Sequence, residues 1–243
     1  MQSTLVGHNT LLIECGGQRI LTDPYFSLGG NPAYIRVTPP ALSREALRDV
    51  SLVLISHTHW DHIDGPFLRM LPPQVPVLAP WQSAWEARLR GGHAVEGLHA
   101  WQSRQVEQVT ITAVPAVHLT FALGFVIEGE GRQVYFAGDT FYIPAMREIG
   151  HRFALDVALI PVTTFRPPMT MGEAGAVRAA HDLHPALIIP IHLGVQPRMP
   201  FLRTRDSVWG FERRLRAAGL EMPVVQLKEG QTWSALPLNP SGA

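Results

Sequence analysis

The hydrophobic positions of this chain fall in short runs separated by turn residues. In the first half, apolar and β-branched side chains gather in segments of strand length, several of them alternating with polar residues, as expected of strands with a buried face. The expected strands span residues 5–15, 18–22, 52–55, 75–79, 109–113, 125–127 and 133–137. Gly16-Gly17 and the segment 128–131 each join two of these strands and predict hairpin turns.

In the last third, strands alternate with helical periodicity. Apolar runs predict strands at 157–162, 186–191, 224–227 and 232–236.

Helices are expected along the whole chain, at 43–49, 66–70, 82–90, 144–149, 170–183 and 211–218. Thr170 and Glu173 have the spacing of a capping box, and Gly150 is placed as a helix stop. No linker, repeat or charge run divides the chain, so we predict one domain over residues 1–243, with mixed sheets and outer helices.

Composition and charge restrict the class of protein. With 46% hydrophobic and 16% charged residues the chain is globular. Lys plus Arg equals Asp plus Glu, at 20 each, which provides no broad positive field and disfavours nucleic acid or an anionic membrane as partner. No apolar run reaches the ~18 residues of a membrane span. The first 18 residues lack Lys and Arg, so we expect no signal peptide.

The single cysteine, Cys15, cannot form an intramolecular disulfide. This favours a reducing compartment, and we expect a cytoplasmic protein. Cys15 lies in an apolar run, which indicates a core residue rather than a nucleophile.

The densest chemistry lies directly after the apolar run 52–55. Residues 56–62 read Ser-His-Thr-His-Trp-Asp-His, so three imidazoles and a carboxylate fall within six residues. From composition alone, such an H-x-H-x-D-H pattern has a chance of occurrence on the order of 10⁻³. Imidazole and carboxylate together suit zinc and its neighbours in the first transition row. The pattern therefore predicts a metal site.

Other ligand-type residues follow other predicted strands. His118 comes after the strand at 109–113, Asp139 after 133–137, and His192 after 186–191. Ligands of open α/β sheets bind beyond the carboxyl ends of strands, so we expect one crevice to gather all these side chains. It would hold five imidazoles and two carboxylates, enough for two metal ions.

With these residues in place, the chain resembles the metallo-β-lactamase superfamily of binuclear metal hydrolases over nearly its whole length. The resemblance rests on the H-x-H-x-D-H loop, His118, Gly138-Asp139-Thr140 and His192. Gly7-His8-Asn9 and the segment 21–24 resemble one branch in particular, that of N-acylphosphatidylethanolamine phospholipase D-like and ascorbate phosphate lactonase-like proteins. The resemblance implies an α+β fold, the four-layer αβ/βα sandwich of two mixed sheets with helices outside.

The resemblance also implies the role of each residue. His57, His59 and His118 would hold one metal ion. Asp61, His62 and His192 would hold a second, and Asp139 would bridge the two. Asp23 would brace the ligand loop, since a ligating imidazole needs a partner for its other nitrogen.

The implied activity is hydrolysis of an ester, lactone or phosphodiester bond in a small-molecule substrate. A hydroxide shared by two divalent ions supplies the nucleophile at neutral pH, and Asp61 is expected to orient it. Zinc suits the ligand set best, with Mn²⁺ and Fe²⁺ as alternatives. His8 is expected to line the pocket or to protonate the leaving group; the alternative is a structural imidazole bonded to backbone.

Weaker indications concern the substrate. Arg36, Arg166 and Arg198 lie in expected loops, where they either clamp an anionic group or stay solvated. Trp60 either contacts substrate or packs over the ligand loop. The loop segment Phe165–Met169 is expected at the rim of the site.

Two other functions are compatible with the same ligands. A redox di-iron protein of this superfamily would carry a flavin domain, for which the chain has no room, and would replace histidines with carboxylates. A non-catalytic metal-binding module would have lost a ligand, whereas all seven positions are filled. The oligomeric state stays open, a homo-oligomer included.

Overall fold

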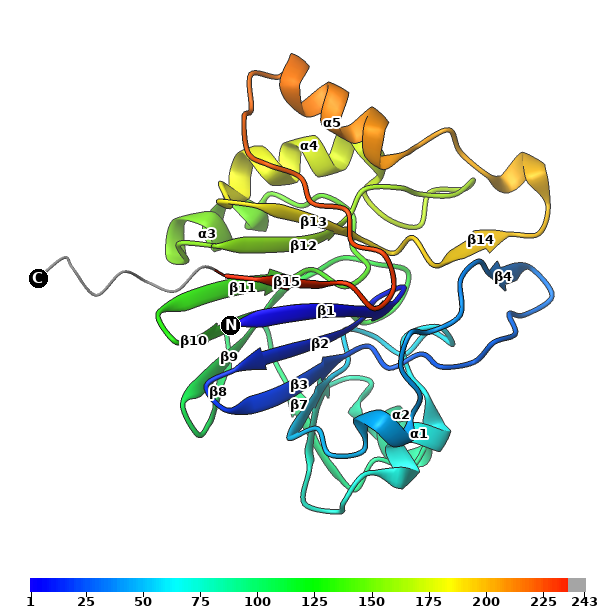
Figure 1. Cartoon of the computed structure of the whole chain (residues 1–243), viewed down its shortest axis with the longest axis vertical. Helices are drawn as coiled ribbons and strands as arrows, with labels where there is room; N and C mark the ends of the chain where they lie inside the picture. The colour runs from blue at the N-terminus through cyan, green and yellow to red at the C-terminus, as the bar shows by residue number, and fades with distance from the viewer. Residues whose placement is uncertain (236–243) are drawn as a thin grey trace, which may run out of the picture.

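A seven-stranded mixed sheet forms one half of the molecule. The computed structural model describes residues 1–235 (Figure 1). The strand order is β15 (Thr232–Ser234), β1 (Gln2–Gly7), β2 (Thr10–Cys15), β3 (Gln18–Thr22), β5 (Leu52–Leu54), β6 (Pro76–Pro80) and β7 (Ala94–Leu98). Strands β15 to β3 pair antiparallel, and β3, β5, β6 and β7 pair parallel. The parallel part places the ends of β3 and β5 at the same edge.

A six-stranded sheet forms the other half. Its order is β13 (Ile188–Ile191), β12 (Val157–Pro161), β11 (Arg132–Phe136), β10 (Leu123–Gly129), β9 (Val109–Pro115) and β8 (Ser103–Val106). Strands β11, β12 and β13 are parallel, and β8 to β11 form antiparallel hairpins. The inner faces of the two sheets share a buried cluster that includes Leu11, Leu54, Phe125 and Leu159.

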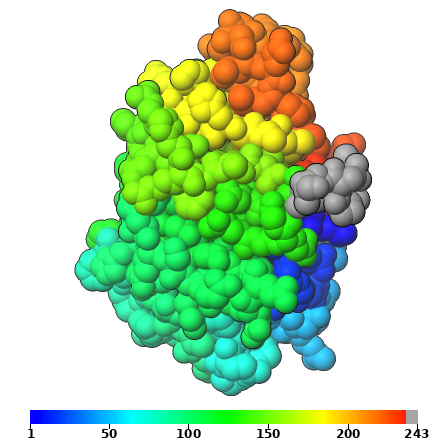
Figure 2. All heavy atoms as spheres, turned by 90° about the vertical axis from the view of Figure 1, so that its left-hand side faces the viewer, coloured from blue at the N-terminus to red at the C-terminus, as the bar shows by residue number. Residues whose placement is uncertain are grey.

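Helices cover both outer faces (Figure 1). A second buried cluster joins α1 (Gly65–Met70) and α2 (Ala84–Leu89) to the seven-stranded sheet. A third joins α3 (Ala145–Arg152), α4 (Gly172–Leu183) and α5 (Val208–Ala217) to the six-stranded sheet. In Figure 2, which shows the face opposite to β4 and β14, α5 in orange forms one end of the molecule, next to α4 in yellow. The predicted α+β sandwich of four layers is therefore confirmed.

A small antiparallel ribbon stands at the edge where the parallel strands end. It pairs β4 (Tyr34–Arg36) with β14 (Val195–Pro197), seen at the right of Figure 1. Residues 25–40 were expected to form a loop, and most do. β4 was not predicted because its partner lies some 160 residues further along the chain, beyond the reach of local patterning.

The first predicted strand is wrong in one respect that matters for the site. Residues 5–15 form not one strand but β1 and β2, which reverse direction at His8 and Asn9. Gly7 has φ +156° and His8 φ +60°, a left-handed conformation that is uncommon outside glycine. The apolar pattern runs on across this turn, so hydrophobic periodicity does not show it.

Several helix boundaries also differ. The expected helix 43–49 is only a 3-10 turn, Glu45–Leu47. α3 continues through Gly150, whose missing side chain lets α3 pack against α4, where a Cβ would collide with the carbonyl oxygen of Asp182. The capping box is absent, because Glu173 instead accepts hydrogen bonds from Ser207 N–H and Arg214. These partners come from tertiary packing, which overrides local preference.

The last strands are shorter than expected, and β7, β8 and β14 were missed. Residues 224–227 form only one bridge, from Val224 to Ile188. The strand 232–236 is present as β15, and Leu236 lies outside the described residues, as does the end of the expected domain 1–243. β8 is polar and mostly exposed, β7 is interrupted by Glu96 and Gly97, and β14 has only three residues, so none of the three shows a strand pattern.

Candidate metal centre

Loops that follow four strands converge at one edge of the sandwich. β5 leads to residues 56–62, β9 to His118, β11 to Asp139 and β13 to His192. A backbone hydrogen bond of 3.0 Å from Leu123 N–H to Ser56 C=O joins the two sheets here. All seven residues predicted to hold metal are thereby brought into one cluster.

The first group of ligand atoms consists of three imidazoles. Nitrogens of His57, His59 and His118 lie within 4.8 Å of one another. His118 Nε2 is 3.1 Å from His59 Nδ1, and His57 Nε2 is buried without a hydrogen-bond partner. Three imidazole nitrogens that converge in this way are a donor set suited to a divalent cation.

The second group contains Asp61, His62, His192 and, in addition, His8. All four side chains are buried. His62 Nε2 and His192 Nδ1 have no hydrogen-bond partner. His8 lies beside His192, with ring centroids 4.3 Å apart, and its Nε2 is 3.3 Å from Asp61 Oδ2. The second ion would therefore meet one carboxylate and at least two imidazoles.

Asp139 lies between the two groups. Its Oδ2 is 3.0 Å from His192 Nε2, 3.5 Å from His62 Nε2 and 3.9 Å from His118 Nε2. Its other oxygen, Oδ1, accepts a hydrogen bond of 3.0 Å from Asn9 Nδ2. One carboxylate oxygen thus faces imidazoles of both groups, as a bridging ligand must.

Asp23 supports the ligand loop from behind. Its carboxylate accepts hydrogen bonds from Ser56 N–H and Ser56 Oγ–H, both 2.6 Å, and lies 2.7 Å from His62 Nδ1. Ser56 Oγ is in turn 3.0 Å from His57 Nδ1. Asp23 therefore orients one imidazole directly and another through Ser56, which leaves the Nε2 atom of each free for a metal ion.

The charges of the cluster shift its pKa values in opposite directions. Burial opposes ionisation of Asp139, but the adjacent His192 and His62 hold its pKa well below the usual range. Burial also opposes protonation of His62, but the carboxylates of Asp139, Asp61 and Asp23 keep its pKa well above normal. Burial, with His62 nearby, lowers the pKa of His57 well below normal. Such perturbation is typical of functional sites.

The donor set fits divalent cations. Buried imidazole nitrogens without a hydrogen bond are costly, and each requires a partner. In this cluster the unpartnered nitrogens belong to His57, His62, His118, His192 and His8. Cations that accept these lone pairs, balanced by the carboxylates of Asp61 and Asp139, would satisfy them together.

Of the four residues predicted to contact substrate, Trp60 alone lies at the cluster. It lines a hollow over the ligands and packs edge-on against Tyr25, with ring centroids 5.4 Å apart. Arg36 stacks on Tyr25 and donates to backbone carbonyls, Arg198 donates to the Asn31 carbonyl, and Arg166 is exposed. None of the three arginines lines the hollow.

Sequence reasoning missed two supporting residues. Asn9 orients Asp139, and Ser56 connects Asp23 with His57. Ser56 begins the motif and Asn9 directly follows His8. The only indication in the sequence was therefore that each is adjacent to a residue already assigned to the site. The carboxylates that they contact, Asp139 and Asp23, lie far away in sequence, and no local pattern indicates these pairs.

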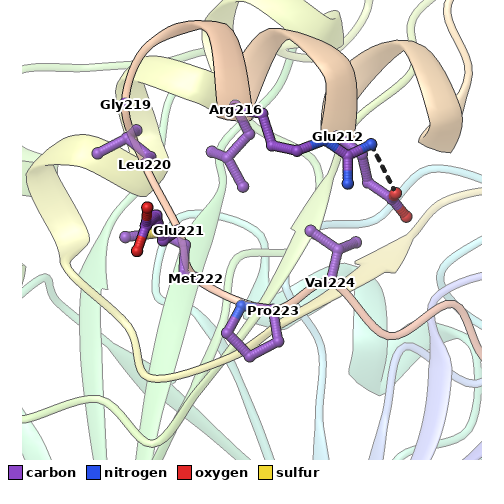
Figure 3. Close-up of a pocket in the computed structure, with 9 residues that line it drawn as sticks. Glu212, Arg216, Gly219, Leu220, Glu221, Met222, Pro223 and Val224 are labelled. Atoms are coloured by element: carbon purple, nitrogen blue, oxygen red, sulfur yellow. Dashed lines mark ion pairs between the residues drawn. The ribbon is translucent and has the colours of Figure 1, made fainter.

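A larger hollow elsewhere has different chemistry. It measures about 570 Å³ and lies between α5 and residues 219–224 (Figure 3). An ion pair of 3.6 Å joins Glu212 and Arg216 at its wall. Its lining residues include no His, Cys or Asp, so it offers no comparable ligand set.

Comparison with known proteins agrees with this ligand chemistry. The family model described as "Beta-lactamase superfamily domain" matches residues 18–193. A UPF0173 metal-dependent hydrolase of Methanopyrus kandleri is 29% identical, over 96% of this chain and 99% of its own. Another, of Deinococcus radiodurans, is 32% identical over 88% and 95%, respectively.

A solved structure has the same fold. Igni18, described as a novel metallo hydrolase from Ignicoccus hospitalis, superposes with a TM-score of 0.75 at 24% identity, over 97% of this chain and 99% of that one.

Within residues 1–235, none of the helices has the length and apolar character needed to cross a bilayer.

Proposed function

The chain belongs to the metallo-β-lactamase superfamily and is a metal-dependent hydrolase, and on this premise we propose that it uses two divalent cations to cleave an ester, lactone or phosphodiester bond. His57, His59 and His118 hold one cation, and Asp61, His62 and His192 hold the other. The observation that carries this proposal is the position of Asp139 Oδ2, which faces imidazoles of both groups at 3.0 to 3.9 Å. Zinc is the cation that this His-rich set favours, ahead of manganese and iron.

The cations, when bound, lower the pKa of a water molecule to about 7 and polarise the bond to be cleaved. In the overall reaction a water oxygen bonds to the acyl carbon or phosphorus. The bond to the leaving oxygen breaks, and a proton from the water ends on that oxygen. Asp61 lines the hollow over the ligands, and its carboxylate accepts a hydrogen bond from the attacking water and so orients it.

His8 acts in this proposal through Asp61. Its side chain is fully buried and does not line the hollow, so it has no direct path to a leaving group. Its Nε2 lies 3.3 Å from Asp61 Oδ2, which makes it a positioning residue. Burial, with His192 nearby, lowers the pKa of His8 to about 4, and the neutral ring can donate one N–H to the carboxylate.

The broader predictions on organisation and location stay proposals. We propose that residues 1–243 act as one domain, because three buried clusters connect both sheets with all five helices. We also propose a cytoplasmic location, on the ground of the single buried cysteine.

The test combines metal analysis with a substrate panel. Purified protein is analysed for metals, stripped with chelator, and assayed on lactone, ester and phosphodiester substrates with Zn²⁺, Mn²⁺ or Fe²⁺ restored. We expect two ions per chain and activity that chelation removes and one of the metals restores. Asp139→Asn should lose both ions. A stripped protein that retains full activity, or an Asp139→Asn variant with both ions, would refute the proposal.

A further inference from the structure

The hollow over the metal centre has a polar floor and apolar walls. Its floor is formed by His59, His192 and the carboxylates of Asp61 and Asp139. Its walls are Tyr34, Trp60, Phe165 and Met169. The volume is about 40 Å³, a few times the ~10–15 Å³ that a cavity needs to hold one water. Only the reacting group of a substrate fits there, and the rest of the molecule must lie against the walls and beyond them.

Contacts between rings hold the walls in place. Phe165 packs against Tyr34 of β4 and against His192, with ring centroids 5.4 and 5.8 Å apart. β4 is fixed by its pairing with β14. The segment after Phe165 is held by hydrogen bonds to Thr164 Oγ1 from Met169 N–H, 2.8 Å, and Thr170 N–H, 3.0 Å. The aromatic surface is therefore built into the fold beside the reacting position.

Positive side chains are absent from the lining of this hollow. Arg36 does not line it, and its Nε and Nη1 atoms donate to the carbonyls of Thr38, Tyr25 and Ser27. An adjoining hollow of about 210 Å³ shares Phe165 and His192 and contains Arg203. There Arg203 donates to the Pro197 carbonyl, and the carboxylate of Asp206 lines the same hollow.

Exposed apolar side chains continue beyond the hollow. The loop that carries His118 also presents Val117, Leu119 and Phe121 to solvent, with 50 to 61% of each side chain exposed. Large exposed apolar groups close to a site are typical of surfaces that bind apolar ligands.

We infer that the substrate is an uncharged acyl compound, an ester or lactone with an aryl or alkyl substituent, and that Phe165, Trp60 and Tyr34 select it. This inference rests on the proposed hydrolytic function. Cations at the centre would polarise the oxygen of a carbonyl or of a phosphoryl group, so the walls must distinguish the substituents that each kind of substrate carries. A phosphodiester retains a negative charge, for which proteins usually supply Arg or Lys. Aromatic walls instead stabilise apolar groups by removing their surface from water.

The experiment compares p-nitrophenyl esters of increasing chain length with bis(p-nitrophenyl) phosphate, on metal-loaded protein. Each added CH₂ that is buried contributes up to ~0.8 kcal/mol, so kcat/KM should rise by about two- to fourfold per CH₂ from acetate to hexanoate. Phe165→Ala should flatten this rise, mainly through KM. Trp209→Ala is the matched control, since Trp209 on α5 is 65% exposed and outside the hollow; it should preserve the slope.

A binding measurement provides a readout without turnover. By calorimetry, hexanamide should bind the wild type more tightly than acetamide or diethyl phosphate, and Phe165→Ala should remove that preference. A higher kcat/KM for the phosphodiester, or a chain-length slope that Phe165→Ala leaves intact, would overturn the inference while leaving the hydrolase proposal in place. Loaded protein that cleaves neither class would refute the hydrolase proposal itself.

Discussion

Gly138 gives a direct test of how the backbone supports the metal centre. It precedes Asp139 and has φ +58°, and a Cβ placed there would lie 2.5 Å from Ser56 Oγ and collide with Ser56 Cβ. Gly138→Ala should therefore strain the backbone and displace Ser56. Left-handed backbone at alanine costs about 1–2 kcal/mol. The loss of one hydrogen bond from Ser56 to the buried Asp23 carboxylate costs about 1.5–3 kcal/mol more. We expect a total loss of unfolding free energy of roughly 2.5–5 kcal/mol.

Gly17→Ala is the matched control. Gly17 also has positive φ, +73°, but a Cβ added there meets nothing within 4 Å. It should lose only the backbone term, about 1–2 kcal/mol. The difference between the two variants, about 1.5–3 kcal/mol, isolates the displacement of Ser56.

Urea unfolding with chelator present, followed by circular dichroism, measures both variants. Metal affinity is then determined by competition with a chromophoric chelator. Gly138→Ala should bind metal about 10- to 100-fold more weakly, since Ser56 and Asp23 orient His57 and His62, and Gly17→Ala should match the wild type. Equal stability losses in the two variants, or unchanged metal affinity in Gly138→Ala, would refute this account of the centre.

Three further predictions follow from the same geometry. Asp23→Asn should weaken metal binding about 10- to 100-fold, measured by chelator competition. The control is Asp64→Asn, at a buried carboxylate that caps α1 through Phe67 N–H, which should reduce stability only. Equal effects of the two substitutions on metal affinity would contradict the role assigned to Asp23. His192→Ala should leave one ion per chain by elemental analysis and lower kcat more than about 100-fold, whereas retention of two ions would argue against it as ligand. Burial raises the pKa of Cys15 from 9.0 to about 11, so native protein should resist iodoacetamide at pH 8 while urea-unfolded protein reacts. Because the unfolded thiol loses its proton first, unfolding free energy should also fall as pH rises from about 9 to about 11, and rapid native labelling would contradict the burial of this thiol.

Local patterns carried most of the fold prediction. The Gly16-Gly17 hairpin is present, with φ +55° and +73° at the two glycines, because such a turn depends on its own residues. The apolar runs at 52–55 and 157–162 form buried strands, because a continuous short apolar run favours a strand buried on both faces. The turn at His8 escaped prediction because apolar residues flank it on both sides. β4 escaped because its pairing with β14 is a long-range contact.

The residues proposed as ligands were recognisable because metal binding restricts residue type. His57, His59, Asp61 and His62 occur together within one loop, and the ends of parallel strands bring His192 and Asp139 to the same edge. This convergence could be expected from strand order alone. The Phe165–Met169 segment was also expected at the rim, and Phe165 and Met169 line the hollow.

The sequence by itself thus determined which atoms are available to a cation and which turns present them, since both depend on residues close together in the chain. Only the tertiary structure decided that Asp23 faces His62, that Asn9 orients Asp139, and that Tyr34 and Phe165 form a wall in which no arginine takes part. Each of these contacts joins segments far apart in sequence. Their geometry is set by the packing of two sheets and an edge ribbon, and packing acts on the whole chain at once.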